Sequence, residues 1–221
     1  ELVSISKVAE QSGEVPLLVD NTFATPILQN PLDHGAAMSM HSATKYLGGH
    51  GDVIGGVIAC SEKHAEMLRP IRAITGAILH PLAAYLLHRG LTTLPLRVRA
   101  QQENARQVAA WLSTHEAVEQ VYFPGMNADP DGVLGTQMSG PGAMVSIRLR
   151  GGAEAAERLT SAVQIFTHAV SLGGVDSLIE NPAALTHRPV AGDAKPAAGI
   201  VRMSIGLESP ADLIADLARG L

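Results

Sequence analysis

Apolar and polar positions alternate along the first part of the chain in the manner of an α/β fold. Apolar residues recur at helical spacing over residues 1–10, and the Gln11-Ser12-Gly13 segment is expected to end this helix. Short apolar runs at 16–19, 38–41 and 53–60 predict buried strands. A helix followed at once by a strand is typical of the middle of an α/β domain. We therefore expect an amino-terminal part of the natural protein to precede this sequence.

Helical periodicity dominates the middle of the chain. It predicts a helix over 62–73 and a second over 81–89. Gly90 and Pro95 are expected to separate this second helix from a long third helix at 96–113. We expect the third helix to bridge two domains.

Beyond the third helix the pattern changes to that of a smaller α+β unit. The expected elements are strands at 118–123, 143–149, 166–170 and 200–205, and helices at 153–163 and from Pro210. The sequence is therefore divided into residues 1–96, part of a large α/β domain, and residues 97–221, a small carboxyl-terminal α+β domain.

The composition narrows the class of function. With 46% hydrophobic and 17% charged residues, the chain is typical of a compact α/β protein. A net charge of −5 and scattered basic residues argue against nucleic acid as a partner. The single cysteine, Cys60, excludes an internal disulfide, fits a reducing compartment and is expected to be an inert core residue. With no signal peptide and no apolar stretch of membrane-spanning length, we expect a cytoplasmic protein and no membrane partner.

One lysine stands out as candidate chemistry. Lys45 lies in the segment H-S-A-T-K-Y-L-G-G-H-G-D (41–52), among small and hydroxylated neighbours. Burial among uncharged groups lowers the pKa of a lysine, which favours Schiff-base formation with an aldehyde. Ser42 and Thr44 supply hydroxyls of the kind that hold a phosphate. Together they suggest a phosphorylated aldehyde cofactor, although an isolated Thr-Lys pair is more often a solvated loop.

Two further polar residues occupy positions that suggest a ligand. Asp20 follows the predicted strand at 16–19, and ligands bind beyond the carboxyl ends of strands in open α/β sheets. Asp20 could equally cap the turn that follows. Arg202 lies within the apolar strand at 200–205, where a buried arginine requires an anionic partner, either a ligand carboxylate or a structural ion pair. The histidines lack metal-ligand spacing, so no metal site is expected.

Five segments resemble the Cys/Met-metabolism family of pyridoxal-phosphate enzymes. They are V-D-N-T-F-A-T-P (19–26), H-S-A-T-K-Y-L-G-G-H-G-D (41–52), S-L-G-G-V-D-S-L (171–178), N-P-A-A-L-T-H (181–187) and V-R-M-S-I-G-L-E (201–208). The family includes cystathionine γ-synthase, cystathionine γ-lyase, methionine γ-lyase and O-acetylhomoserine sulfhydrylase. The resemblance implies the fold of the aspartate aminotransferase-like PLP-dependent transferases. An incomplete large domain that binds pyridoxal 5'-phosphate (PLP) would then precede a smaller α+β domain.

The resemblance also implies roles for the residues of the predicted cofactor site. Lys45 is similar to the Schiff-base lysine, which also shuttles protons. Asp20 is similar to the partner of the pyridine nitrogen, and Thr22 to a residue beside the ring. Ser42 and Thr44 are similar to the residues that hold the phosphate.

For the substrate, the resemblance implies that Arg202 binds the α-carboxylate beside the Ser171–Leu172 backbone. Enzymes that handle cystathionine tend to carry glutamate where this chain has Val170, so an apolar residue favours the methyl thioether of methionine. Gly174, in contrast, is more similar to the cystathionine enzymes. The expected activity is α,γ-elimination on methionine. Cystathionine γ-lyase and the γ-replacement reactions of cystathionine γ-synthase or O-acetylhomoserine sulfhydrylase remain the alternatives.

The resemblance further implies a homotetramer with active sites shared between subunits. Family members are nearly twice as long as this chain, and the phosphate-binding glycine turn and the ring that stacks on the cofactor belong to their other part. A second, non-enzymatic hypothesis is a degenerate subunit that does not bind the cofactor.

Overall fold

The described residues of the computed structural model form two compact units. The structure describes residues 1–13, 15–126, 129, 132–187, 189–190 and 192–221. The first unit comprises residues 1–95 and 129–140, and the second comprises residues 96–128 and 141–221. Residues 129–140 thus group with the amino-terminal residues, whereas the sequence placed them in the second domain. The assignment of residues 1–96 and 97–221 to a cofactor-binding and a small domain stays a prediction.

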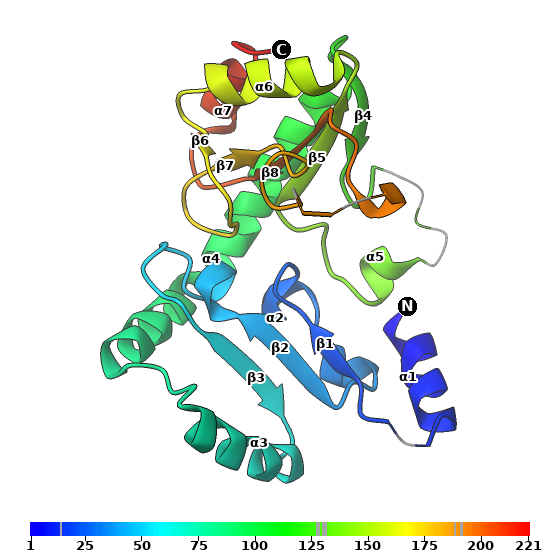
Figure 1. The fold of residues 1–221 in the computed structure, drawn as a ribbon, viewed down its shortest axis with the longest axis vertical. Coiled ribbons are helices and arrows are strands. Elements are labelled where there is room, and N and C mark those ends of the chain that lie inside the picture. Colours follow the sequence, from blue (N-terminus) through cyan, green and yellow to red (C-terminus); the bar gives the residue numbers. More distant parts are fainter. Residues whose placement is uncertain (14, 127–128, 130–131, 188, 191) are drawn as a thin grey trace. The chain divides into compact units, whose positions relative to one another are not determined.

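The first unit is organised around a three-stranded sheet (Figure 1). Its strands, in spatial order, are β1 (Leu18–Asp20), β2 (Met38–Ser42) and β3 (Gly56–Cys60). β1 and β2 run parallel, with Asp20 opposite Met40, whereas β3 runs antiparallel to β2. The carboxyl ends of β1 and β2 therefore meet at one edge of the sheet.

Helical segments surround this sheet. They are α1 (Leu2–Gln11), α2 (Thr25–Leu28), the 3-10 helix η1 (Pro31–His34), the π-helical turn η2 (Ala43–Leu47), α3 (Glu62–Thr75), the first part of α4 (Pro81–Leu112) and the short α5 (Val133–Thr136). No helix in the described part of the chain has the length and apolar character needed to span a bilayer.

The prediction of buried strands was wrong for β1 and β3, whereas the residues of β2 alternate between half-buried and buried. Residues alternate between exposed and half-buried in β1, and most of β3 is exposed. Both are edge strands of a small sheet, so each has only one neighbouring strand. Helix α3 has no buried residue. The apolar runs therefore marked the strands, but they did not determine how well this unit covers them.

The prediction that Gly90 and Pro95 interrupt the helix was also wrong, because α4 is one continuous helix of 32 residues. Gly90 is required by packing: a Cβ there would lie 2.5 Å from the carbonyl oxygen of Gly48 and 2.7 Å from that of Leu47. Pro95 lies inside the helix. A proline there removes only the hydrogen bond that its own N–H would donate to the carbonyl of Leu91, and the helix continues on both sides of it.

The second unit contains a five-stranded sheet in the order β4-β5-β8-β7-β6. The strands are β4 (Val118–Tyr122), β5 (Met144–Leu149), β6 (Thr167–His168), β7 (Leu178–Glu180) and β8 (Ile200–Ser204). The helices are the second part of α4, α6 (Gly152–Ala162), the 3-10 helix η3 (Gly192–Ala194) and α7 (Pro210–Leu217). Only β6 and β7 pair in parallel within this sheet, and the other described pairs are antiparallel.

One face of this sheet carries the core of the unit. Ile147, Ile179 and Met203 are fully buried on three adjacent strands, and α6 and α7 contribute the buried Leu159 and Leu213. α6 and α7 lie close together (Figure 1), with Gly220, just beyond α7, against Leu159. The sequence missed β7, because three residues are too few to display the period of a strand.

Candidate active site

The carboxyl ends of β1 and β2 are joined by side-chain hydrogen bonds. The Asp20 carboxylate oxygen Oδ1 accepts the hydroxyl of Thr22 at 2.6 Å and the Thr22 backbone N–H at 3.1 Å. The Thr22 hydroxyl oxygen in turn accepts the backbone N–H of Ser42 at 2.8 Å. The structure thus brings together three of the predicted site residues, and Asp20 does cap its turn as the alternative interpretation proposed. Its second oxygen, Oδ2, has no hydrogen-bond partner among the described residues.

Lys45 lies in the turn η2, directly after β2, and is half-buried. The backbone at Lys45 departs from helical geometry, with φ −92° and ψ −131°, and its carbonyl accepts the N–H of Gly49 at 2.8 Å. Tyr46 and Leu47 anchor the turn, with only 1% and 4% of their surfaces exposed. Gly49 has a φ of +74°, a conformation that glycine adopts without strain. The motif therefore builds a fixed turn around the lysine.

Thr44 ties this turn to the start of β3. Its hydroxyl accepts the N–H of Gly55 at 3.1 Å and lies 3.4 Å from the carbonyl oxygen of the same residue. The second of these hydrogen bonds is long, so the hydroxyl proton can rotate to a stronger acceptor. The hydroxyl of Ser42 has no partner among the residues that the structure describes.

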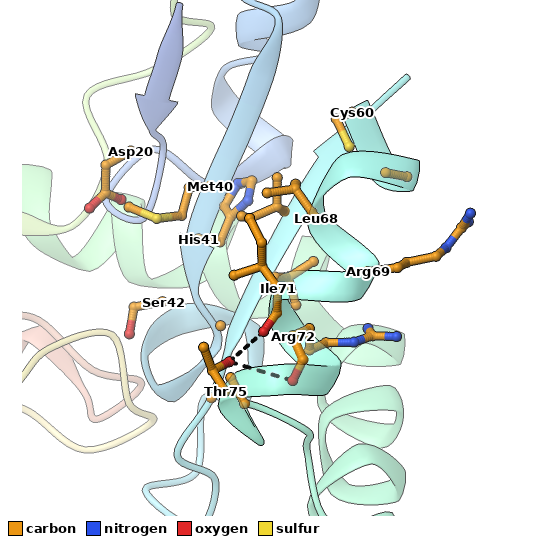
Figure 2. Close-up of a pocket in the computed structure, with 16 residues that line it drawn as sticks. Asp20, Met40, His41, Ser42, Cys60, Leu68, Arg69, Ile71, Arg72 and Thr75 are labelled. Atoms are coloured by element: carbon orange, nitrogen blue, oxygen red, sulfur yellow. Dashed lines mark hydrogen bonds between the residues drawn. The ribbon is translucent and has the colours of Figure 1, made fainter. Parts of the chain in front are cut away.

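A cavity of about 710 Å³ lies between the sheet and α3. Figure 2 shows Asp20, Met40, His41 and Ser42 on its strand side and Leu68, Ile71 and Thr75 on the side of α3. Asp20 and Ser42 line this cavity, whereas Thr22, Thr44 and Lys45 are not among its lining residues. Cys60 lines it as well and is half-buried, so the prediction that it is a core residue was wrong. It ends the edge strand β3, where one side of the strand is uncovered.

His41 occupies a polar position that the sequence did not identify. It is buried, and its Nε2 lies 3.2 Å from Nδ2 of Asn21. Because an amide nitrogen only donates, Nε2 of His41 must accept, which requires the neutral imidazole with its proton on Nδ1. Burial lowers the pKa of His41, and the nearby Asp20 carboxylate offsets part of this shift. His41 is therefore held neutral beside the predicted cofactor residues.

In the second unit, Arg202 pairs with a buried carboxylate. Nη2 of Arg202 lies 2.8 Å from Oε1 of Glu180, and it also donates to the carbonyl oxygen of Ser171 at 3.1 Å. The structural ion pair that was left open for Arg202 is thus present. Glu180 was not predicted, because it belongs to the short strand β7 that the apolar pattern did not mark.

The Ser171-Leu172-Gly173-Gly174 segment adopts an unusual backbone conformation. Ser171 has a φ of +96°, which is strained for a residue with a side chain. Leu172 is buried, whereas Val170 is 52% exposed. The N–H of Gly173 donates to Ser204 Oγ at 2.8 Å and is therefore engaged within the chain. Among the described residues, no group of three or more His, Cys, Asp and Glu side chains is arranged to hold a metal ion.

Known proteins share both the sequence and the fold of this chain. The family model for Cys/Met metabolism PLP-dependent enzymes matches residues 1–221. An L-methionine gamma-lyase of Brevibacterium sandarakinum is 55% identical over 222 residues, which cover 100% of this chain and 56% of that protein. CalE6 of Micromonospora echinospora has been solved as an apo methionine gamma lyase, with a TM-score of 0.94, 41% identity and coverage of 99% of this chain and 60% of that one. A second structure of CalE6, described as a cystathione gamma lyase, gives a TM-score of 0.94, 40% identity and coverage of 100% and 59%.

These matches confirm the resemblance and the expected fold. The chain spans between half and two thirds of the length of these relatives. The family match, by contrast, extends over the whole of the chain. The chain belongs to the Cys/Met metabolism family of PLP-dependent enzymes.

Proposed function

We propose that the chain is part of a PLP-dependent carbon–sulfur lyase that converts methionine to α-ketobutyrate, methanethiol and ammonia. The observation that carries this proposal is the edge of the first sheet, where Asp20, Thr22 and Ser42 are hydrogen-bonded together and Lys45 follows directly. The L-methionine gamma-lyase from B. sandarakinum, at 55% identity, supports the choice of reaction.

The residues of this edge fit the cofactor of the family. PLP carries a pyridine nitrogen, an aldehyde and a phosphate, and the edge offers a complementary group for each. Asp20 has one carboxylate oxygen fixed by Thr22 and a second oxygen without a partner among the described residues, as a partner of a protonated ring nitrogen requires. The Ser42 hydroxyl and, after rotation, that of Thr44 would hold the phosphate.

In the proposed mechanism the cofactor supplies an electron sink that stabilises negative charge on the substrate α-carbon. Lys45 would hold the aldehyde until the substrate arrives, and its amine would then move the α-proton. Asp20 would keep the proton on the ring nitrogen, because a carboxylate beside a cation favours its charged form. The turn η2 holds the backbone of Lys45 directly after β2, from which its flexible side chain carries the amine.

Arg202 is proposed to bind the α-carboxylate of the substrate. A guanidinium has five N–H donors, and only those of Nη2 are engaged within the described residues. Nε and Nη1 therefore remain as donors for a carboxylate, and the side chain is 20% exposed. The observed ion pair with Glu180 is compatible with this role, because it occupies a different nitrogen.

The exposed Val170 supports methionine as the substrate. An apolar side chain there gives the distal ammonium group of cystathionine no partner, whereas it tolerates a methyl thioether. Cystathionine γ-lyase activity is the second candidate, and it is favoured by the two descriptions of the similar CalE6 protein as a methionine and a cystathione gamma lyase. We further propose that the full-length protein is cytoplasmic and that, as the family resemblance implies, it is a homotetramer whose subunits share active sites.

The experiment is an assay of the full-length protein, loaded with PLP, on methionine and on cystathionine. We expect methanethiol and α-ketobutyrate from methionine, and a higher kcat/KM for methionine than for cystathionine. Lys45→Ala is the control, and it should abolish both products. A protein that releases no methanethiol above this control would refute the methionine reaction. A protein that also shows no visible absorbance after incubation with PLP would instead be a subunit that does not bind the cofactor.

A further inference from the structure

Glu180 is a fully buried carboxylate on the sheet of the second unit. It lies on β7 directly opposite Arg202 on β8, and its side chain is 0% exposed. Residues that lie opposite each other in adjacent strands project from the same face of the sheet. The 2.8 Å contact between Glu180 Oε1 and Arg202 Nη2 is therefore set by the strand register and not by a flexible loop.

The surroundings of Glu180 hold its carboxylate in one orientation. Oε1 also accepts the hydroxyl of Thr186 at 3.1 Å, whereas Oε2 is buried with no hydrogen-bond partner in the described part of the chain. Taking a carboxylate out of water is costly, and a buried ion pair seldom adds net stability over apolar residues of the same volume. A gain in stability therefore does not explain a glutamate at position 180. The effect of this glutamate on Arg202 does explain it.

That effect is to fix the rotation of the guanidinium group. Nη2 is held between Glu180 Oε1 and the carbonyl oxygen of Ser171, so one nitrogen of the planar group has two acceptors. The Ser171 that supplies this carbonyl has a strained backbone, with φ +96°. Because the guanidinium is planar, fixing Nη2 also fixes the directions of the donors on Nε and Nη1.

We propose that Glu180 is a positioning residue that aims the Nε and Nη1 donors of Arg202 at the substrate α-carboxylate. This inference rests on the proposed function, in which Arg202 binds that carboxylate. Glu180 does not touch the substrate, and it lowers the cost of carboxylate binding because the guanidinium no longer has to be ordered when the substrate arrives. The loss of a hydrogen bond between charged groups should weaken binding by about tenfold.

The test measures the binding of two matched probes to the full-length PLP-loaded enzyme, from the change in its visible absorbance. L-Norleucine carries the carboxylate and has no leaving group, whereas n-pentylamine is the same molecule with hydrogen in place of the carboxylate. We expect Glu180→Leu, which has no acceptor, to raise the Kd of norleucine about tenfold and to leave the Kd of pentylamine unchanged. Glu180→Gln keeps an acceptor oxygen, so its Kd for norleucine should stay within about threefold of the wild-type value.

Three results would overturn the inference: equal weakening of both probes by Glu180→Leu, no weakening of norleucine, or the same weakening by Glu180→Gln as by Glu180→Leu. If Glu180→Leu does not fold, Thr186→Val removes one hydrogen bond from Oε1 and should weaken norleucine alone by about threefold. In that case an unchanged ratio of the two Kd values would contradict the inference. Arg202→Leu tests the underlying function separately: if it leaves the norleucine Kd unchanged, Arg202 does not bind the carboxylate at all.

Discussion

Thr22 donates a hydrogen bond of 2.6 Å from its hydroxyl to Oδ1 of Asp20, and thereby fixes the carboxylate at the end of β1. The same hydroxyl oxygen accepts the N–H of Ser42, so it also links β1 to the end of β2. Thr22 therefore sets the direction of the acid that is proposed to face the cofactor nitrogen. Its role differs from the one that the sequence resemblance implied, a position beside the ring, but the two are compatible.

Thr22→Val should lower kcat/KM for methionine by about 10- to 100-fold, which corresponds to the loss of about 1.5–3 kcal/mol from a hydrogen bond to a charged group. Thr22→Ser retains the hydroxyl and is the matched control, so it should stay close to the wild-type enzyme. Steady-state kinetics of the full-length enzyme would measure both. Equal activity of the valine and serine variants would show that the hydroxyl does not orient Asp20.

His41 predicts a dependence of stability on pH. Burial lowers the pKa of His41 in the folded protein, so the unfolded chain binds a proton more readily. The stability contributed by neutral His41 is therefore present above its unfolded pKa of about 6.5 and is lost as the pH falls through the folded value. Thermal unfolding between neutral pH and mildly acidic pH should show a decreasing Tm, and His41→Gln should reduce this decrease. An unchanged dependence in the variant would contradict the interpretation.

Gly90 predicts that α4 and the lysine turn are coupled through packing. In Gly90→Ala the new methyl group would lie 2.5 Å from the carbonyl oxygen of Gly48, so the turn must shift. We expect a loss of about 1–3 kcal/mol in stability, although alanine is the better helix former. We also expect a lower occupancy by PLP, measured from the visible absorbance.

Gly56→Ala is the matched control for this prediction, because the nearest atom to its Cβ is the His41 carbonyl oxygen at an ordinary 3.7 Å. It should change neither stability nor PLP occupancy appreciably. If both glycine variants behave alike, close packing of Gly90 is not what holds the turn.

Val170 predicts how substrate choice can be changed. Val170→Glu places a carboxylate at an exposed position next to Ser171, where the distal ammonium of cystathionine could pair with it. The ratio of kcat/KM for cystathionine to that for methionine should rise by about tenfold, the effect expected of one new charged hydrogen bond. Val170→Gln, which adds similar bulk without the charge, should change the ratio much less. A ratio that both variants leave unchanged would show that this position does not select the substrate.

The sequence predicted the elements of this chain better than their surroundings. The apolar runs marked β2 and β8 closely, since strand residues alternate between two faces and the pattern depends only on local backbone geometry. Whether β1 and β3 are buried depends on the segments that cover them, and a local sequence pattern does not reveal those segments. Gly90 gives a second example. Its low helix propensity predicted an end to the helix, whereas the structure shows that a glycine is needed there because the backbone of Gly48 lies close.

Only some residues of the candidate site could be predicted from the sequence. Lys45, Asp20 and Arg202 could be proposed because each is a charged residue in or beside an apolar run. Glu180 and His41 could not be proposed from the sequence, because each depends on a partner that is distant in the chain. Glu180 pairs with Arg202 on the adjacent strand, and His41 contacts Asn21, which directly follows β1. The one signal in the sequence for a buried acid near Arg202 was the position of this arginine within an apolar strand.

The central claim, that Lys45 binds the cofactor, is tested most directly by borohydride reduction of the full-length PLP-loaded enzyme followed by peptide mass spectrometry. Reduction converts an imine between lysine and aldehyde into a stable amine. The account predicts a phosphopyridoxyl group on Lys45 and none on Lys7, Lys63 or Lys195. An unmodified Lys45 in protein that retains bound PLP, or modification at one of the other three lysines instead, would contradict it.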